Sequence, residues 1–371
     1  MIYADNAATT RLDTDAFEAM RPFLLEEYAN ASQPYSFSRN VKKALRDARS
    51  TIASCIGALA EEIYFTSGGT ESDNWAIKGL MRPGDMRLMI TSQIEHHAVL
   101  NACLSIERMG IPVWRLPVSQ EGIVEVEAFQ TSISDQTKLV SVMLANNEIG
   151  TVEPVSALAE IAHKHGALFH TDAVQAVGHI PVDVKALGVD LLSASGHKFN
   201  GPKGVGFLYI KKGTEIQPYA DGGGQESRVR AGTENIASIV AMACALRKNC
   251  DRMITVSERL SRMERTFIHT LNEAGVDYIR NGADNHIPGN INISIRDASG
   301  ESLLHRMDLK GICISTGSAC DSINTQVSHV IKGIGVPKEY AQGTIRISFG
   351  ADNAEADAFK IATTLIEILR K

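Results

Sequence analysis

The chain has 371 residues, of which 44% are hydrophobic and 22% are charged, and its formal net charge is -6. This length suffices for a large buried core and predicts two domains, while the acidic balance and the lack of a Lys/Arg run argue against a nucleic-acid-binding surface. No apolar run approaches the ~20 residues of a membrane helix, and the start of the chain lacks a signal-peptide pattern, so we expect a cytoplasmic protein without membrane contact.

Short apolar strands alternate with helical segments in the first two thirds of the chain. The predicted strands are Ile63–Thr66, Arg87–Ser92, Pro112–Leu116, Leu139–Ala145, Ala167–Thr171, Leu191–Ala194 and Val205–Ile210. Helices are predicted from about Glu71, at His97–Arg108 and at Val155–Lys164. This alternation is typical of an α/β fold with a mostly parallel sheet and helices on both of its faces.

The last third of the chain has a different pattern. A helical stretch runs from about Ile236 to Glu273, and shorter elements follow it. These are strands at Asn290–Ile295, Cys313–Ser315 and Thr344–Phe349, and helices near Glu301–Met307, Val327–Ile334 and Ala354–Leu369. We therefore predict a large domain of residues 13–250 and a small α+β domain made of residues 1–12 and 251–371.

Several reactive side chains follow predicted strands, and the carboxyl ends of parallel strands form the ligand-binding edge of such sheets. Gly68-Gly69-Thr70 lies between a strand and a helix, Asp172 ends a strand, and Lys198 closes Ser195-Gly196-His197-Lys198. Each has an ordinary alternative: a structural turn, a helix cap or a surface lysine. Together they suit pyridoxal phosphate (PLP), with the lysine as Schiff base, the acid on the pyridinium nitrogen and the polar neighbours on the phosphate.

With these groups in place, the chain resembles the cysteine desulfurases, which are fold-type I PLP enzymes of the class V aminotransferase family. The resembling motifs are Ala4–Thr10 (ADNAATT), Thr66–Asn74 (TSGGTESDN), Glu95–His97 (EHH), Asn146–Gly150 (NNEIG), Ser195–Lys198 (SGHK) and Arg230–Asn235 (RAGTEN). They follow the family order. The resemblance implies a large domain with a central sheet, a small α+β domain, and PLP as the cofactor.

The resemblance also implies roles on the ring of the cofactor. Lys198 would bind PLP covalently and move the α-proton of the substrate, and Asp172 would pair with the ring nitrogen. Gln175 would bond the phenolic oxygen of the ring. His96 would stack on the ring face and transfer protons.

Further implied roles concern the phosphate and the substrate. The Gly69 backbone, Thr70, Ser195 and His197 would hold the phosphate. Thr233 would reach the phosphate of a neighbouring subunit, so we expect a homodimer. Asn147, next to the cofactor, and Arg346 would hold the carboxylate of L-cysteine, with Arg346 as a two-pronged donor.

The six cysteines form no CxxC pair and no zinc-like spacing, so we expect no metal site and a reduced protein. Cys55, Cys103, Cys244 and Cys313 lie in helical or apolar patterns typical of packing, and Cys250 has no motif around it. Cys320 instead ends Ser315-Thr316-Gly317-Ser318-Ala319-Cys320, whose composition is typical of an exposed, movable loop. Composition alone leaves a structural thiol open. The resemblance implies that Cys320 attacks the substrate sulfur and carries it as a persulfide to an acceptor protein.

The sequence departs from the family at three positions and leaves several functions open. Tyr35 and Ser38 replace a usual His and Gly, and Asp321 stands where Thr is common. The acceptor could serve iron–sulfur cluster assembly, tRNA thiolation or DNA phosphorothioation. The alternatives are a selenocysteine lyase, a class V aminotransferase, which would not need Cys320, and a non-catalytic relative, which would not need Lys198.

Overall fold

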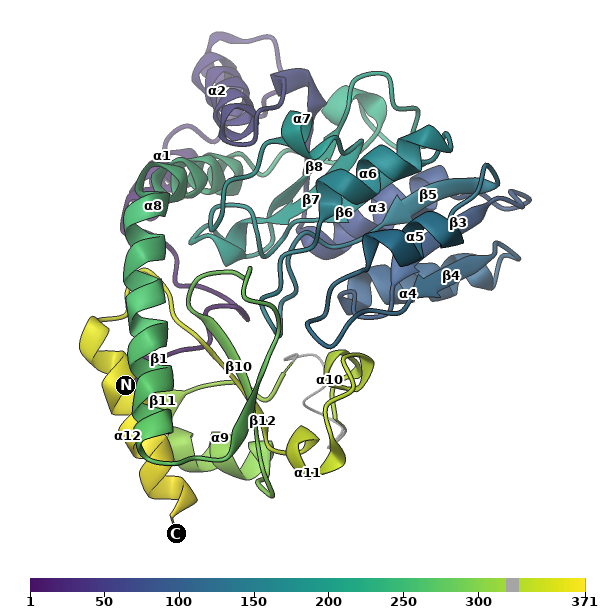
Figure 1. Cartoon of the computed structure of the whole chain (residues 1–371). Coiled ribbons are helices and arrows are strands. Elements are labelled where there is room, and N and C mark those ends of the chain that lie inside the picture. The colour runs from purple at the N-terminus through teal and green to yellow at the C-terminus, as the bar shows by residue number, and fades with distance from the viewer. Residues whose placement is uncertain (318–326, 371) are drawn as a thin grey trace.

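The computed structural model describes residues 1–317 and 327–370. Its two largest hydrophobic clusters are joined by one long helix, α8 (Ile236–Glu273), which Figure 1 shows running from one to the other. The first cluster lies against a seven-stranded sheet and the second against a three-stranded sheet. None of the helices in the described part of the chain has the length and apolar character that a membrane span requires.

The larger sheet is mostly parallel, as the sequence predicted. Its strands, in spatial order, are β2 (Ile63–Thr66), β8 (Gly206–Ile210), β7 (Leu191–Ser195), β6 (Leu168–Asp172), β5 (Thr137–Ser141), β3 (Leu88–Ser92) and β4 (Val113–Leu116). Within this sheet β8 runs antiparallel to both of its neighbours. All described neighbours among the remaining strands are parallel.

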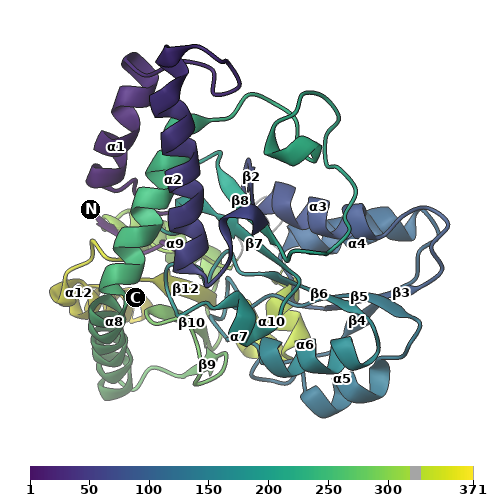
Figure 2. The ribbon, with the colours of Figure 1, turned by 90° about the horizontal axis from the view of Figure 1, so that it is seen from above.

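Helices cover both faces of this sheet, as Figure 2 shows from above. They are α3 (Gly69–Leu80) and α4 (His97–Glu107) on one face, and α5 (Val126–Ser132), α6 (Val155–Lys164) and α7 (Val184–Leu187) on the other. Alternate side chains of a strand point to opposite faces, so Leu191 of β7 packs in the α3–α4 cluster while Leu192 packs in the α6 cluster. This two-sided burial explains why the strands are continuously apolar.

The second core lies beside a small antiparallel sheet in which β10 (Asn290–Ile295) pairs with β9 (Tyr278–Asn281) and β12 (Thr344–Ser348). Around it lie α9 (Gly300–Asp308), α12 (Glu355–Leu369) and the shorter α10 (His329–Gly333) and α11 (Lys338–Ala341). The N-terminus reaches this core, because β1 (Ile2–Tyr3) pairs with β11 (Ile312–Cys313). The helix α8 continues through the predicted domain boundary at residue 250, so the exact division of the chain stays a prediction.

Two helices near the N-terminus, α1 (Thr14–Leu25) and α2 (Arg39–Cys55), pack against α8 and were not predicted. One predicted strand, Leu139–Ala145, is too long. It ends at Ser141 because the Glu95 carboxylate accepts the Met143 N–H at 3.0 and 3.1 Å, in place of a β3 carbonyl. The predicted helix at Val327–Ile334 begins at His329, where the Ser328 side chain caps it.

Candidate active site

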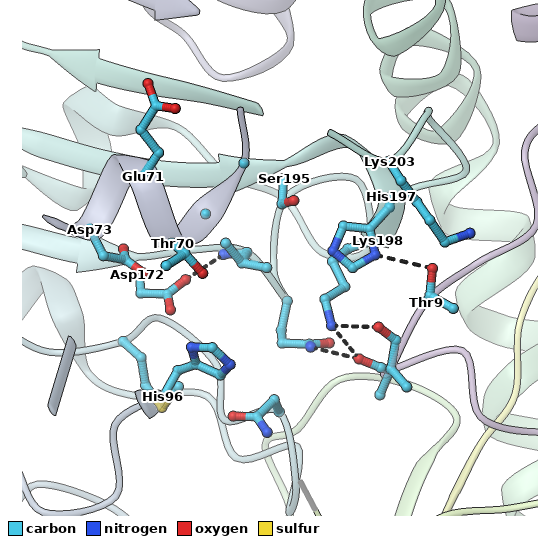
Figure 3. A pocket seen from close by; sticks show the side chains of 18 of the residues that line it. Thr9, Thr70, Glu71, Asp73, His96, Asp172, Ser195, His197, Lys198 and Lys203 are labelled. Atoms are coloured by element: carbon cyan, nitrogen blue, oxygen red, sulfur yellow. Dashed lines mark hydrogen bonds between the residues drawn. The ribbon is translucent and has the colours of Figure 1, made fainter. Parts of the chain in front are cut away.

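A cavity of about 460 Å³ opens at the carboxyl ends of the parallel strands. It gathers ten of the predicted site residues, and Figure 3 shows several of them from close by. These ten are Gly69, Thr70, His96, Asn147, Asp172, Gln175, Ser195, His197, Lys198 and Arg346. Thr233 lies outside the cavity of its own chain, on an exposed loop. Cys320 lies outside the described residues.

Lys198 reaches into the cavity from a short turn, Gly196–Lys198, that directly follows β7. Its Nζ donates to the carbonyl oxygens of Ala7 at 2.6 Å and Ala8 at 2.9 Å. Both acceptors are uncharged backbone groups, so they orient the amine without demanding that it stay protonated. An amine held in this way can act as a nucleophile or as a base.

Asp172 is the last residue of β6, and its side chain lies beside the cavity. One carboxylate oxygen accepts the Val174 N–H at 2.9 Å. Burial raises the pKa of Asp172 to about 6, although this hydrogen bond and the nearby Lys198 oppose the shift. Asp172 is therefore still ionised at neutral pH, and it presents one negative charge to whatever occupies the cavity.

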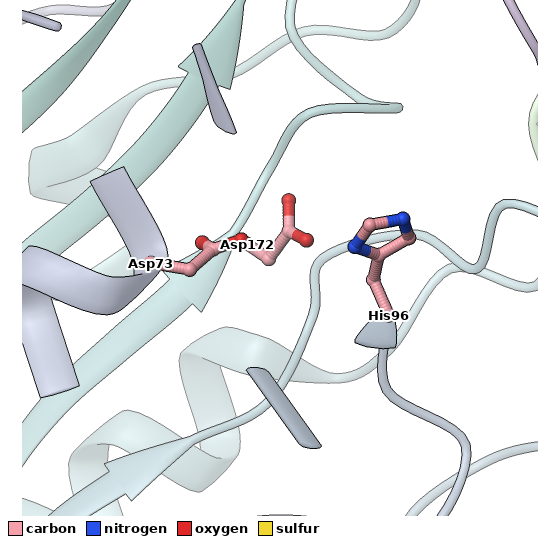
Figure 4. A group of neighbouring side chains, drawn as sticks. All are labelled: Asp73, His96 and Asp172. Carbon is pink, nitrogen blue, oxygen red and sulfur yellow. The ribbon is translucent and has the colours of Figure 1, made fainter. Parts of the chain in front are cut away.

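A second acid lies behind Asp172. Atoms of Asp73, Asp172 and His96 come within 4.8 Å of one another, and Figure 4 shows the three side chains converging. Burial and the neighbouring Asp172 raise the pKa of Asp73 well above its usual range. Because two adjacent buried carboxyls do not both ionise readily, Asp73 is the neutral member of the pair and Asp172 the anion. No pattern in the sequence predicts this pairing of Asp73 with Asp172.

His96 caps the N-terminus of α4 and faces Asp172 across the cavity (Figure 4). Its Nδ1 accepts the Ala98 N–H at 3.1 Å. This bond requires an unprotonated Nδ1, so the ring carries its proton on Nε2 when it is neutral. The cap also fixes the plane of the imidazole, as a residue that stacks on a planar ligand requires.

An anion-binding cradle lies at the start of α3. Gly68 caps this 12-residue helix with a φ of +148° and no side-chain bond, so the first N–H groups point outward. A Cβ on Gly69 would lie 2.6 Å from Val174, so only glycine fits there. Burial lowers the pKa of His197 to about 4, which keeps the ring neutral. Its Nδ1 lies 3.1 Å from the Thr9 hydroxyl.

One wall of the cavity is formed by residues that follow the strands of the large sheet, and we call it the sheet side. It comprises Gly69, Thr70, Asp172, Ser195, His197 and Lys198. They fit PLP on structural grounds. The cradle accommodates a phosphate, Lys198 supplies an amine for the aldehyde, and Asp172 supplies a buried anion for a ring nitrogen. Gln175 instead donates to the Ala7 carbonyl at 3.0 Å, so its predicted contact with the ring oxygen stays a prediction.

Asn147 and Arg346 line another wall of the cavity, and together with Asp5, which contacts Arg346, they are called the arginine side. Arg346 is only 1% exposed, and it donates from Nη1 to the Asn147 carbonyl at 2.8 Å and from Nη2 to the Asp5 carboxylate at 2.7 Å. Its Nε is buried and has no partner among the described residues. A buried N–H without an acceptor is costly, which indicates that a ligand oxygen belongs there.

The N-terminal segment 5–10 belongs to a family motif, but no role in the site was predicted for it. Ala7 and Ala8 hold Lys198, Ala7 also holds Gln175, and Thr9 contacts His197. Most of these contacts are made by backbone carbonyls, which every residue type has, so the residue types give no indication of them. By contrast, Tyr35 and Ser38, two of the noted departures, do not line the cavity.

The family model described as aminotransferase class-V matches residues 2–360. The cysteine desulfurase IscS of Dictyoglomus turgidum is 47% identical, over all of this chain and 95% of that protein. A NifS-like protein of known structure superposes with a TM-score of 0.94 and 34% identity, over 100% of this chain and 99% of that one. A structure described as SspA in complex with cysteine gives a TM-score of 0.84 and 33% identity, over 94% and 99%.

Proposed function

The chain belongs to the class-V aminotransferase family, and we propose that within it the protein is a PLP-dependent cysteine desulfurase. Such an enzyme removes sulfur from L-cysteine, releases L-alanine and passes the sulfur to an acceptor. One observation carries the proposal: an amine, a buried anion and a buried, partly unpartnered arginine surround a single cavity. An amino acid bound through its carboxylate at Arg346 would have its reactive carbons near Lys198.

The residues of the chain divide the chemistry between them. PLP, when bound, withdraws electrons from the α-carbon of the substrate. Asp172 keeps the ring nitrogen protonated, Lys198 moves the α-proton, and Asn147 and Arg346 hold the carboxylate. The Cys320 thiolate then attacks the substrate sulfur, so that an S–S bond forms while the Cβ–Sγ bond breaks. Proton return to the carbons completes alanine, and the persulfide stays on Cys320.

The proposal includes three finer statements. The enzyme is a homodimer in which Thr233 completes the site of the partner subunit, and the exposed position of Thr233, away from its own cavity, supports this. The persulfide passes to a sulfur-acceptor protein. The protein works in the cytoplasm, which agrees with the five cysteines of the described chain being unpaired.

Mass spectrometry after brief exposure to L-cysteine tests the function. We expect one added sulfur on the Cys320 peptide, with alanine released, and we expect Cys320→Ala to lose both. Cys313→Ala is the matched control, because burial raises the pKa of the half-buried Cys313 and makes it a poor nucleophile. Alanine without a persulfide, or undiminished alanine in Cys320→Ala, would rule out Cys320 as the nucleophile and favour a lyase or an aminotransferase.

A further inference from the structure

Arg346 has one charged partner in the described chain, and that partner is Asp5. The contact uses only one prong of the guanidinium, with Nη2 donating to one Asp5 oxygen at 2.7 Å. The other terminal nitrogen is bonded to the Asn147 carbonyl, while Nε has no acceptor among the residues that the structure describes. The guanidinium is thus held by two hydrogen bonds, and its remaining N–H groups, including that of Nε, can still donate to a ligand.

The position of Asp5 is fixed by the backbone on both sides of it. Ala4 donates to the Cys313 carbonyl at 2.9 Å and accepts from Ser348 N–H at 2.8 Å. Asn6 donates to the Ser348 carbonyl at 3.1 Å. Asp5 is therefore clamped between β11 and β12, and β12 is the strand that carries Arg346. Backbone hydrogen bonds therefore hold the acid beside the strand that carries the arginine.

These contacts give Asp5 two opposing effects on a carboxylate ligand. As an acceptor, it aims the guanidinium so that the remaining donors face the cavity. As an anion, it offsets the charge of Arg346 and repels a second carboxylate bound at the same guanidinium. The first effect favours binding of a carboxylate and the second weakens it.

We propose that Asp5 is a positioning residue that sets how tightly the cavity holds the carboxylate of its amino-acid substrate and product. The inference rests on the proposed function, since it takes an amino acid as the ligand. A moderate affinity for the carboxylate allows the product to dissociate while the substrate is still held in a defined orientation. Asp5 achieves this by aiming Arg346 and moderating its charge at the same time.

The test compares two substitutions of Asp5 in the holoenzyme, with L-alanine as the probe. Binding is followed by the change in the absorbance of the holoenzyme as L-alanine is added. Asp5→Ala removes both acceptor and charge, and we expect binding about tenfold weaker. Asp5→Asn keeps an acceptor and removes the charge, and we expect binding about three- to tenfold tighter than in the wild type.

Ethylamine, which is L-alanine without its carboxylate, is the control ligand. We expect its binding to be the same in all three proteins, because it makes no contact with Arg346. Equal weakening of alanine by both substitutions, or no effect of either, would overturn the proposal, as would parallel changes in ethylamine binding. If Asp5→Ala fails to fold, Asp5→Asn alone decides, because alanine binding no tighter than wild type contradicts the charge effect.

This outcome can be separated from failure of the proposed function. If the wild-type protein forms alanine from cysteine while the Asp5 substitutions leave alanine binding unchanged, only the role of Asp5 is wrong. If the wild type neither binds alanine nor forms it from cysteine, the proposed function itself is wrong.

Discussion

The sheet side and the arginine side of the cavity are assembled in different ways. On the sheet side, Asp172 and Ser195 end two adjacent parallel strands and Lys198 follows directly, so the pairing of β6 with β7 sets their spacing. On the arginine side, Arg346 meets Asn147 and Asp5, which lie 199 and 341 positions away in the sequence. The first arrangement depends on a strand ladder, and the second on how two cores pack together.

The two walls differ in how far they can adjust to a substitution. A strand register cannot shift slightly, because a one-residue slip turns every side chain to the other face. The side chains to which we assign proton transfer therefore lie on the more rigid wall. The arginine side is held by a few specific hydrogen bonds, so single substitutions can tune its affinity. Substitutions on the sheet side should stop the reaction, whereas those on the arginine side should change how much substrate is needed.

The largest effect is expected for Lys198→Ala. Without the amine there is no covalent link to the cofactor and no base near the α-carbon, so alanine formation should fall by about 10⁴-fold or more. Lys198→Arg is the matched control, because it keeps the charge but not the nucleophile, and we expect it to be equally inactive. The measurement is the rate of alanine formation at saturating cysteine. Substantial activity in Lys198→Arg would show that the charge alone suffices.

Asp172→Asn should have two effects of opposite sign. The amide cannot hold the ring nitrogen protonated, so turnover should fall by about 10²-fold or more. The cofactor-free protein, however, should become more stable at pH 8. The pKa of Asp172 is about 6 in the folded protein and 3.8 in an unfolded chain, so the folded state loses stability as the pH rises from about 4 to 6. The substitution should recover at most about 3 kcal/mol of this loss.

Urea unfolding of the cofactor-free proteins measures this stability change. The stabilisation should be present at pH 8 and absent below pH ~4, where the wild-type carboxyl is protonated in both states. Equal stability of the two proteins at pH 8 would mean that Asp172 is not an unfavourable buried charge. The sheet side would then contain no buried charge that lowers the free energy of unfolding.

Arg346→Lys should give the smallest of these effects. A lysine keeps the charge but loses the fork, so the KM for cysteine should rise about 10- to 100-fold while kcat changes much less. Arg115→Lys is the control, because Arg115 makes two bonds to Glu107 away from the cavity. The measurement is the dependence of alanine formation on cysteine concentration. A fall in kcat as large as that of Lys198→Ala would erase the distinction between the two sides.

The sequence allowed most of the sheet side to be predicted, because its groups follow apolar strands at short spacings. The β6 and β7 strand ends and the Gly68–Thr70 turn were located from local pattern alone, and the mostly parallel sheet is confirmed. The roles assigned to single residues stay predictions. Asp73 and the N-terminal segment 5–10 were missed as parts of the cavity. Asp73 lies within α3, and nothing in the sequence of this helix predicts that Asp73 lies next to Asp172. Segment 5–10 contributes mainly backbone carbonyls, which every residue type has.

The arginine side shows why the remainder resisted prediction. Arg346 was assigned through family resemblance, but nothing in the local sequence joins it to Asp5 or to the Asn147 carbonyl. The Asp5 contact arises only when the segment that follows β1 meets β12 in the small core. The end of β5 was misplaced for a similar reason. A side chain from another segment, Glu95, takes the hydrogen bond that a neighbouring strand would otherwise make.

The bond between Asp5 and Arg346 also bears on the order in which the molecule matures. Loops that span hundreds of residues close late, because chain entropy opposes them until the intervening structure has formed. At a synthesis rate of ~5–20 residues per second, tens of seconds separate the appearance of Asp5 from that of Arg346 on the ribosome. The sheet can form in the meantime. The bond between Asp5 and Arg346 can therefore form only after the last strand, β12, has emerged.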